Sequence, residues 1–347
     1  MAERNDAVRA EAPATRPADG AIAVHAEALV KTYRSRAGVV EAVRGVDLDV
    51  AAGEVFGFLG PNGAGKSTTV RMLTTLLSIT SGTARVAGVD VAHQPDLARR
   101  RMGVALQEAG LDPRQTGREL LILQGRLFNL SHRDAARRAG ELLELVELEE
   151  AADRRINGYS GGMKRRLDLA SALVHEPDVL FLDEPTTGLD PASRLTVWDE
   201  VRRINTRGTT VFLTTQYLEE ADELAGRVAI IDNGRIVREG NPQVLKTAIG
   251  ADTLVVSVGT DHEGRASEVL RQFGRERAAK TGAVAIGIDG GASALSGALR
   301  ALEDAGIPVE HVELDAPSLD DVFAEATGRR LEGAAAPEDA GPPGAAR

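Results

Sequence analysis

The octapeptide Gly60-Pro-Asn-Gly-Ala-Gly-Lys-Ser67 has the residue types and spacing of a phosphate-binding loop. Its three glycines allow a tight turn in which backbone N–H groups point at phosphate oxygens, and the helix expected from Lys66 onward directs its positive end at the same anion. We expect Lys66 to reach the β- and γ-phosphates and the Ser67 hydroxyl to ligate Mg²⁺. The predicted cofactor-binding residues of this loop are Gly60, Pro61, Asn62, Gly63, Ala64, Gly65, Lys66, Ser67 and Thr68.

Two acids, Asp183 and Glu184, directly follow the apolar run Val179–Leu182. A short continuous apolar run is typical of a strand that is covered on both faces. Ligands of α/β sheets bind beyond the carboxyl ends of the strands, so these acids are expected beside the phosphate loop. We expect Asp183 to hold Mg²⁺ through water or the Ser67 hydroxyl, and Glu184 to polarise an attacking water. The alternative is a pair of solvated acids, and the presence of the phosphate loop disfavours it.

A second anion-binding helix N-terminus is predicted at Ser160-Gly161-Gly162, before a helix expected over Lys164–Val174. Serine is a favourable N-cap residue, and the two glycines expose backbone N–H groups. The chain has one phosphate loop, so this second element predicts that each site is shared between two copies.

The elements that must position these residues alternate between strands and helices from Ile22 to about Ile249. Val46–Val50 alternates apolar and acidic residues with period two, as a half-buried strand does. Val55–Leu59 and Thr209–Thr214 are continuous runs of the kind found in covered strands. The pattern predicts an α/β core with a largely parallel sheet plus antiparallel strands.

Between about Asp112 and Gly158 the strand pattern gives way to helices. Thr116–Glu119 forms a capping box that opens a predicted helix through Phe128. Ser131–Asp134 opens another, which is expected to run to about Val146. We therefore predict a helical insertion over residues 112–158.

The chain beyond Gly250 changes character and predicts a small second α/β domain. The expected order is βαβαβ, with strands over residues 253–258, 283–288 and 309–314 and helices over 265–273 and 292–305. The terminal segments are rich in Ala, Gly and Pro and have too little apolar surface to offset the entropy of ordering. The predicted domains are a disordered tail (1–20), a nucleotide-binding domain (21–249), an accessory domain (250–330) and a second disordered tail (331–347).

Composition excludes several classes of protein. The chain of 347 residues has a formal charge of −11, which disfavours a general nucleic-acid-coating role. It has no cysteine, so disulfides, thiolate nucleophiles and Cys-ligated metals are excluded. We find no run of about 20 apolar residues and no signal-peptide pattern at Met1, so we expect a chain that needs a partner for any membrane function.

The series of motifs resembles the ATP-binding-cassette (ABC) ATPases over about Ile22–Ile249. Ser160–Met163 resembles the signature motif, with Met163 where the family more usually has Gln. Gln107 ends the strand-like segment Met102–Leu106 and matches the Q-loop residue. The resemblance implies an ABC ATPase core with a helical subdomain, Mg-ATP as the cofactor, and ATP hydrolysis coupled to transport.

Further matches complete the implied site. Gly188–Asp190 resembles the D-loop, and Tyr33 matches the aromatic residue that stacks on adenine. Gln216 stands where the family has its switch histidine, and it can hydrogen-bond a γ-phosphate or orient water but cannot become cationic. Glu184 is then left as the best base, or hydrolysis is slow, and Gln216 is the second predicted catalytic residue. The implied metal-site residues are Ser67, Gln107 and Asp183.

Three features resemble the ATPase subunits of daunorubicin-resistance-type drug exporters: Thr-Thr-Gln-Tyr at residues 214–217, the appended α/β segment, and Pro317–Ala324 followed by Thr327-Gly-Arg329. The alternative is that Pro317–Ala324 has only a structural role, as an amphipathic helix with Leu319, Val322 and Phe323 packed inward and Asp320 and Asp321 solvated.

The resemblance implies a head-to-tail homodimer in which Ser160–Gly162 of one copy close over nucleotide held by the other. It also implies a separately encoded membrane permease, a peripheral position at the cytoplasmic face of the membrane, and export of a drug, antibiotic or other hydrophobic compound. Two alternatives remain: a permease-free ABC-type ATPase of DNA repair or translation, and the ATPase of an importer. The accessory domain is left with three roles: regulation, dimerisation or stabilisation.

Overall fold

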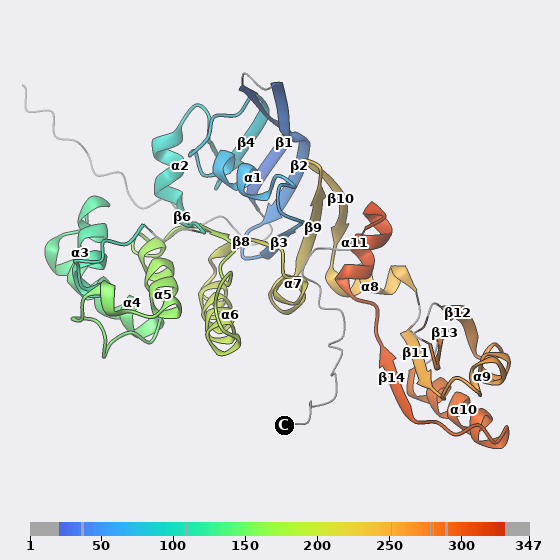
Figure 1. Cartoon of the computed structure of the whole chain (residues 1–347). Coiled ribbons are helices and arrows are strands. Elements are labelled where there is room, and N and C mark those ends of the chain that lie inside the picture. Colours follow the sequence, from blue (N-terminus) through green and yellow to red (C-terminus); the bar gives the residue numbers. More distant parts are fainter. Residues whose placement is uncertain are drawn as a thin grey trace, which may run out of the picture. The chain divides into compact units, whose positions relative to one another are not determined.

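The computed structural model describes residues 21–35, 38–107, 110–250, 252–277, 279, 281–288 and 291–329 (Figure 1). The chain divides into two compact units, the first formed by residues 1–58, 62–215 and 233–236 and the second by 59–61, 216–232 and 237–347. The predicted disordered tails, 1–20 and 331–347, lie outside the described residues. The predicted boundary between residues 249 and 250 separates two domains that we expect to fold independently. The division into compact units does not test independent folding, so this boundary stays a prediction.

The first unit carries the strands and helices of the predicted core. Their bounds are β1 (Ile22–Ser35), β2 (Gly38–Ala51), β3 (Val55–Leu59), α1 (Lys66–Leu73), β4 (Ser81–Val86), β5 (Val89–Asp90), α2 (Pro95–Arg101), β6 (Met102–Ala105), α3 (Gly117–Leu127), α4 (His132–Leu145), a 3₁₀ turn (Ile156–Gly158), α5 (Gly161–Ala172), β7 (Val179–Asp183), α6 (Pro191–Thr206) and β8 (Thr210–Thr215).

Two sheets organise this unit. One is antiparallel with the strand order β2-β1-β4-β5, and its strand β2 buries alternate residues over Val46–Val50, as the period-two pattern predicted. The other places β3, β8, β7 and β6 in that order, with β6, β7 and β8 paired in parallel. Every residue of β7 is buried, which confirms the prediction of a strand covered on both faces.

The helical segment begins where the sequence predicted. Thr116 and Glu119 form the reciprocal capping box of α3, because each side chain bonds the backbone N–H of the other. Ser131 caps α4 by accepting from the Asp134 N–H. Ser160 caps α5, which begins at Gly161 and ends at Ala172, so the helix starts three residues before the predicted Lys164. The helix predicted over 265–273 runs from Glu263 to Leu270 and so ends three residues early, and the other predicted helices are confirmed to within about two residues.

The second unit contains the remaining elements. Their bounds are α7 (Leu218–Leu224), β9 (Arg227–Asp232), β10 (Arg235–Gly240, whose first two residues belong to the first unit), α8 (Pro242–Ile249), β11 (Asp252–Ser257), α9 (Glu263–Leu270), β12 (Gly274–Arg277), β13 (Ala283–Ile288), α10 (Gly291–Asp304), β14 (His311–Asp315) and α11 (Leu319–Thr327).

Residues 252–315 form a four-stranded antiparallel sheet with the order β12-β13-β11-β14 (Figure 1). The predicted βαβαβ order was wrong, because the chain inserts the short strand β12 before β13. β12 was missed since Gly274–Arg277 is exposed, polar and without period-two apolar residues. The corrected order, βαββαβ with the outer strands β12 and β14, is the split βαβ arrangement of ferredoxin-like folds.

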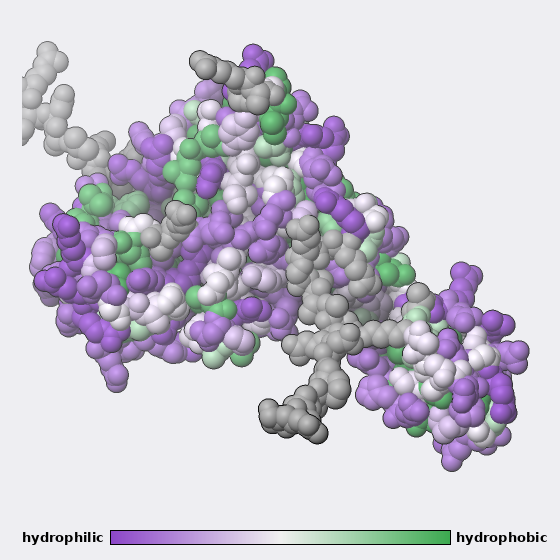
Figure 2. Space-filling view, in the orientation of Figure 1, coloured by the Kyte–Doolittle hydropathy of each residue, from purple (hydrophilic) through white to green (hydrophobic). Residues whose placement is uncertain are grey.

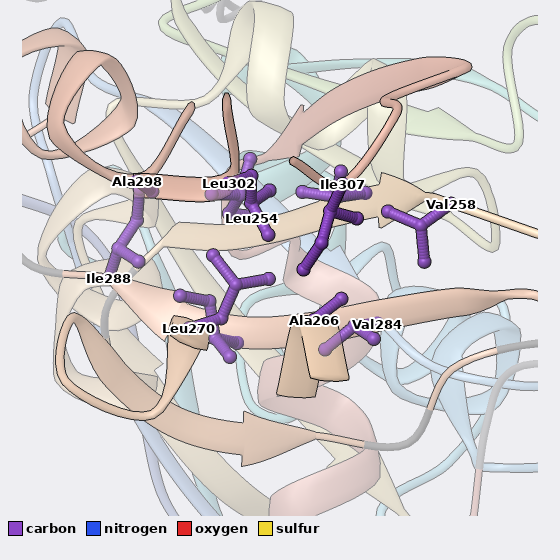
Figure 3. Packing of buried hydrophobic residues seen from close by; sticks show 11 residues of the cluster. Leu254, Val258, Ala266, Leu270, Val284, Ile288, Ala298, Leu302 and Ile307 are labelled. Carbon is purple, nitrogen blue, oxygen red and sulfur yellow. The ribbon is translucent and has the colours of Figure 1, made fainter. Parts of the chain in front are cut away.

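The core of this module lies on one face of its sheet. Leu254 and Ile286 of the central strands pack with Leu270 of α9 and Leu302 of α10, and all four are fully buried (Figure 3). Both helices therefore cover the same face. On the visible side of the space-filling view, the module's rim is mainly hydrophilic, as expected when the apolar residues lie inside (Figure 2).

The final helix, α11, has its own packing partners within the second unit. Leu319, Val322 and Phe323 pack with Ala221 of α7 and Val228 of β9, so the predicted inward face is confirmed. Asp320 was expected to be solvated, but it is only 6% exposed.

Asp321 was also expected to be solvated and instead closes a capping box with Ser318. Beyond the helix, Arg329 forms an ion pair with Asp232 at 2.5 Å. The segment from Pro317 to Arg329 is therefore held by apolar packing, a capping box and an ion pair.

No helix within the described parts of the chain is long and apolar enough to cross a membrane.

Replacing Leu254 with Ala tests whether the central strand of the βαββαβ module carries its stability. Leu254 is fully buried, and we expect the change to lower the free energy of unfolding of the module by about 2–5 kcal/mol. The measurement is hydrogen exchange of the β11 and β13 amides. Leu314 lies opposite Leu254 on β14 and is 38% exposed, so Leu314→Ala is the matched control with a smaller effect. Equal losses in the two variants would contradict the assigned core.

Candidate functional site

The phosphate-loop sequence forms a sharp turn between β3 and α1. Gly65 is the N-cap of α1 and has φ 111°, a left-handed value that side chains rarely adopt. Lys66 and Ser67 therefore occupy the first two positions of the helix, where backbone N–H groups are left without helical partners. Within the same turn, the Thr69 hydroxyl donates to the Gly65 carbonyl at 2.9 Å. Gly60 and Pro61 directly follow β3, as predicted.

Asp183 ends β7 and is almost fully buried. Its Oδ1 accepts from the Ser67 hydroxyl at 3.1 Å and from the Thr214 hydroxyl at 2.5 Å. Two of the three residues implied for the metal, Ser67 and Asp183, are thus in contact, and the third, Gln107, donates to Glu184. Thr214, on the neighbouring strand β8, fixes the carboxylate from the other side.

Glu184 has an unusual backbone conformation for a residue with a side chain. Its φ is 49°, in the left-handed region, which costs free energy and persists only when the surroundings hold it. The Glu184 N–H donates to the Thr214 carbonyl and hydroxyl oxygens, each at 3.1 Å. Thr214 therefore holds both acids. Its hydroxyl donates to the Asp183 carboxylate, and its hydroxyl and carbonyl oxygens accept from the Glu184 N–H.

Three side chains converge on the Glu184 carboxylate, which is 7% exposed. The Lys66 ammonium lies 3.3 Å from Oε1. The Gln107 amide and the Thr187 hydroxyl donate to Oε2 at 3.4 Å and 3.2 Å. The structure therefore brings together Lys66, Gln107 and Glu184, with Ser67 and Asp183 joined to each other beside them.

The electrostatics of Lys66 reflect this burial. Desolvation lowers the pKa of the Lys66 ammonium from its ordinary value, and the charge of Glu184 acts in the opposite direction. The buried Lys66 ammonium, at the first position of α1, is suited to binding an anion such as a phosphate. The site can therefore bind polyphosphate and place a carboxylate beside it.

Ser160, Gly161, Gly162 and Met163 lie at the start of α5. A side chain at Gly162 would meet the Ser193 hydroxyl at 2.9 Å, so a residue without Cβ is required there. Ser193 is in turn bonded to Asp190, the N-cap of α6, through both its N–H and its hydroxyl. These hydrogen bonds lower the pKa of Asp190. The predicted signature residue Gly162 therefore lies close to Ser193, which is hydrogen-bonded to the predicted D-loop residue Asp190.

The remaining predicted residues are placed separately. Tyr33, on β1, is 41% exposed and has the Lys31 ammonium 5.4 Å from its ring centre. One face of an exposed ring remains suited to stacking on a base. Met163 accepts from the Arg154 guanidinium at 3.4 Å. Gln216 directly follows β8 and is half-buried.

Sequence reasoning missed two residues that shape this site. Thr214 looks like an ordinary strand residue, and only its position one strand away from Asp183 would have indicated its contacts. Arg165 follows the signature motif and is 8% exposed, which is rare for arginine and invisible in the sequence pattern.

The donor set suits Mg²⁺ better than a transition metal. No group of three or more His, Cys, Asp or Glu side chains able to hold a metal occurs among the residues that the structure describes. Mg²⁺ in nucleotide sites needs one or two protein oxygens, with phosphates and water supplying the rest. The Ser67 hydroxyl and the Asp183 carboxylate, 3.1 Å apart, are oxygens of this kind.

Comparisons with known proteins show which family the chain resembles. The family model described as ABC transporter matches residues 43–187. The daunorubicin resistance ATP-binding protein DrrA2 of Streptomyces coeruleorubidus is 48% identical over 92% of this chain and 99% of its own length. The daunorubicin/doxorubicin resistance ATP-binding protein DrrA of Streptomyces peucetius is 47% identical over 88% of this chain and 92% of its own. The Nod factor export ATP-binding protein I of Paraburkholderia xenovorans is 44% identical over 67% and 76%.

Solved structures show the same fold. The ATP-binding cassette MJ0796, in a dimeric post-hydrolysis state bound to ADP and Pi, superposes with a TM-score of 0.58 at 28% identity, over 63% of this chain and 98% of that one. The cbiO1 component of the cbiONQ transporter of Clostridium perfringens superposes with a TM-score of 0.60 at 25% identity, over 67% and 94%. The predicted fold class is confirmed.

Replacing Thr214 with Val tests whether this residue positions the two acids. The change keeps the shape but removes the donor to Asp183 and an acceptor for the Glu184 N–H. We expect the free energy of unfolding to fall by about 1–3 kcal/mol. We expect hydrolysis of a bound nucleoside triphosphate to slow by at least about tenfold, equivalent to about 1.4 kcal/mol of barrier. Urea unfolding and a phosphate-release assay measure the two effects.

Thr210→Val is the matched control, because it removes a buried acceptor for the Gly53 N–H at the opposite end of the same strand. It should lose similar stability and keep its hydrolysis rate. Equal hydrolysis rates in the two variants would show that Thr214 has no special role at the site.

Proposed function

Because the chain belongs to the ATP-binding subunits of ABC transporters, which hydrolyse ATP to drive transport, we propose that it powers export of a drug, antibiotic or other hydrophobic compound through a separately encoded permease. Relatives named for daunorubicin resistance match nearly the whole chain, including the βαββαβ module, and this supports the choice of cargo class. A further relative is named for export of Nod factor, which favours export over import.

The convergence of Lys66, Gln107 and Thr187 on the Glu184 carboxylate is the observation that carries the catalytic proposal. Lys66 binds the β- and γ-phosphates, and Glu184 accepts the proton of the attacking water. Gln107 and Gln216 orient that water or the γ-phosphate, while Tyr33 stacks on the adenine. Positioning and charge supply most of the rate in phosphoryl transfer, so a weak base suffices when it is well placed.

Mg²⁺ would be held by the Ser67 hydroxyl and the Asp183 carboxylate, with Gln107 as the third residue that we assign to it, and would neutralise the charge that develops on the phosphate oxygens. The Thr214 hydroxyl orients Asp183. The chain thereby keeps two ligand oxygens 3.1 Å apart.

The nucleotide-bound form in this proposal is a head-to-tail dimer. Ser160, Gly161 and Gly162 of one copy close over the γ-phosphate held by the other, with Asp190 beside them. The MJ0796 cassette, which shares this fold, is described as dimeric with ADP and Pi. Loss of the γ-phosphate removes negative charge shared by donors of both copies, so the bridge weakens and the dimer opens.

A peripheral position on the cytoplasmic face of the membrane, bound to the permease, follows from the proposal. The helical insertion, residues 112–158, presents Leu123 and Leu127 of α3 to solvent, 43% and 66% exposed. Apolar side chains on a helix surface are suited to burial against a partner. They make α3 the expected contact with the permease.

Glu184→Gln tests the catalytic assignment. Without a base, ATP hydrolysis should fall by at least about 100-fold. ATP binding should be retained, because the Lys66 ammonium loses a competing carboxylate. The variant should accumulate as an ATP-dependent dimer, seen by light scattering after size-exclusion chromatography.

Two controls accompany this variant. Glu144→Gln makes the same chemical change at an exposed position on α4 and should behave as the unaltered chain. Lys66→Ala should lose ATP affinity and form no nucleotide-dependent dimer. Normal hydrolysis by the Glu184 variant would reject Glu184 as the base, and a normal dissociation constant for the Lys66 variant would reject the phosphate-loop assignment.

Leu127→Glu tests the permease contact. We expect the tagged chain to capture a multi-span membrane protein from solubilised membranes of its own cells, and the variant to lose it. ATP binding should be unchanged, since α3 carries no nucleotide contact. Val244→Glu places the same charge on α8 at a residue 65% exposed and should retain capture. Co-purification of ribosomes or DNA without a membrane protein would favour a permease-free ATPase instead.

A further inference from the structure

Arg165 is a buried arginine that contacts backbone on both sides of the candidate base. It lies in the first half of α5 and is 8% exposed. Its Nε donates to the Pro185 carbonyl at 2.8 Å, and its Nη2 donates to the Asp183 carbonyl at 3.2 Å. Asp183 and Pro185 are the residues directly before and after Glu184. The guanidinium therefore holds the turn in which Glu184 adopts its left-handed conformation.

The same guanidinium also reaches the strand that leads to the Q-loop residue. Nη1 donates to the Leu106 carbonyl at 2.5 Å, and Leu106 directly precedes Gln107. Gln107 in turn donates to Glu184. One side chain thus fixes the backbone behind both residues that meet at the reacting end of the site.

The charge of Arg165 makes these contacts stiff. Hydrogen bonds from a charged donor are about twice as strong as neutral ones, and a planar guanidinium fixes direction as well as distance. Asp168, one turn along α5, accepts from Nη1 at 3.3 Å. Burial raises the pKa of the Asp168 carboxyl to about 6, against the lowering effect of Arg165, so the pair keeps opposite charges at neutral pH.

We propose that Arg165 is a positioning residue that couples the two nucleotide sites of the dimer, by transmitting displacement of the Ser160–Gly162 helix start to the backbone around Glu184 and Gln107. The inference rests on the proposed function, in which Ser160–Gly162 close over the nucleotide of the other copy. One rigid helix carries both Ser160 and Arg165. When Ser160 closes over the partner's nucleotide, Arg165 therefore moves with it and displaces the backbone around Glu184 of its own chain. Arg165 contacts no nucleotide in this arrangement and acts through Glu184 and Gln107.

Arg165→Lys in the full-length chain tests the coupling, because it keeps the charge and removes the planar fork. ATP affinity, measured with a fluorescent ATP analogue, should stay within about threefold, since Lys66 and Ser67 are untouched. We expect kcat to fall at least about tenfold, the scale of a small displacement of a reacting group. The Hill coefficient for ATP hydrolysis should fall toward 1, because the sites no longer communicate.

Asp168→Asn is the second variant. It removes the carboxylate that is paired with Arg165 and leaves the hydrogen bonds from Arg165 to the backbone in place. It should shift kcat and the Hill coefficient in the same direction by a smaller factor. Arg166→Met is the matched control, since Arg166 is the next residue of α5 and donates to the carbonyls of Val146 and Glu147. It should leave both quantities unchanged.

The outcomes separate the inference from the function on which it rests. A cooperative, dimerising wild-type chain whose Arg165→Lys variant keeps its kcat and Hill coefficient would overturn the coupling role alone. Equal losses in Arg166→Met would also overturn it, by showing a general effect of α5. A wild-type chain that shows neither cooperativity nor an ATP-dependent dimer would overturn the shared site and the coupling together.

Discussion

A buried carboxylate held next to the binding place of a polyanion is the constraint on which this site depends. Glu184 is 7% exposed and adopts a left-handed backbone conformation, so its position costs both desolvation and strain. Lys66 supplies the compensating charge, while Thr214 accepts from the Glu184 N–H and so holds the backbone at this residue. The parallel pairing of β7 with β8 brings Asp183 next to Thr214, so the sheet itself fixes the position of this acid.

The helical region is tied to that acid through α5. Ser160 is the N-cap of this helix. Arg165, about one turn further along, donates to the backbone carbonyls on both sides of Glu184. In the proposed function this helix begins at the nucleotide of the other copy and holds the backbone around the base of its own copy. The proposed coupling role gives a reason for an arginine to be buried here, although burial of a charge is costly.

The sequence predicted the local devices well and the long-range contacts poorly. The phosphate loop, the capping box at Thr116 and the covered strand at Val179 depend on neighbouring residues, so their patterns are legible. Thr214 and Arg165 bond residues more than 15 positions away and were not recognised as parts of a motif, whereas the equally long-range contact of Ser67 with Asp183 was predicted because each lies in one. The strand β12 was missed for a different reason: it is an exposed edge strand, and its pairing with β13 supplies the order that its composition lacks.

The central claim is that Lys66 and Glu184 change partners when nucleotide binds. A structure of the full chain with Mg²⁺ and a non-hydrolysable ATP analogue measures this most directly. The account predicts the Lys66 ammonium at hydrogen-bond distance from the β- and γ-phosphate oxygens, the metal at Ser67 and Asp183, and the Glu184 carboxylate facing the γ-phosphate through a water. A nucleotide bound away from Lys66, with the 3.3 Å Lys66–Glu184 contact unchanged, would contradict it.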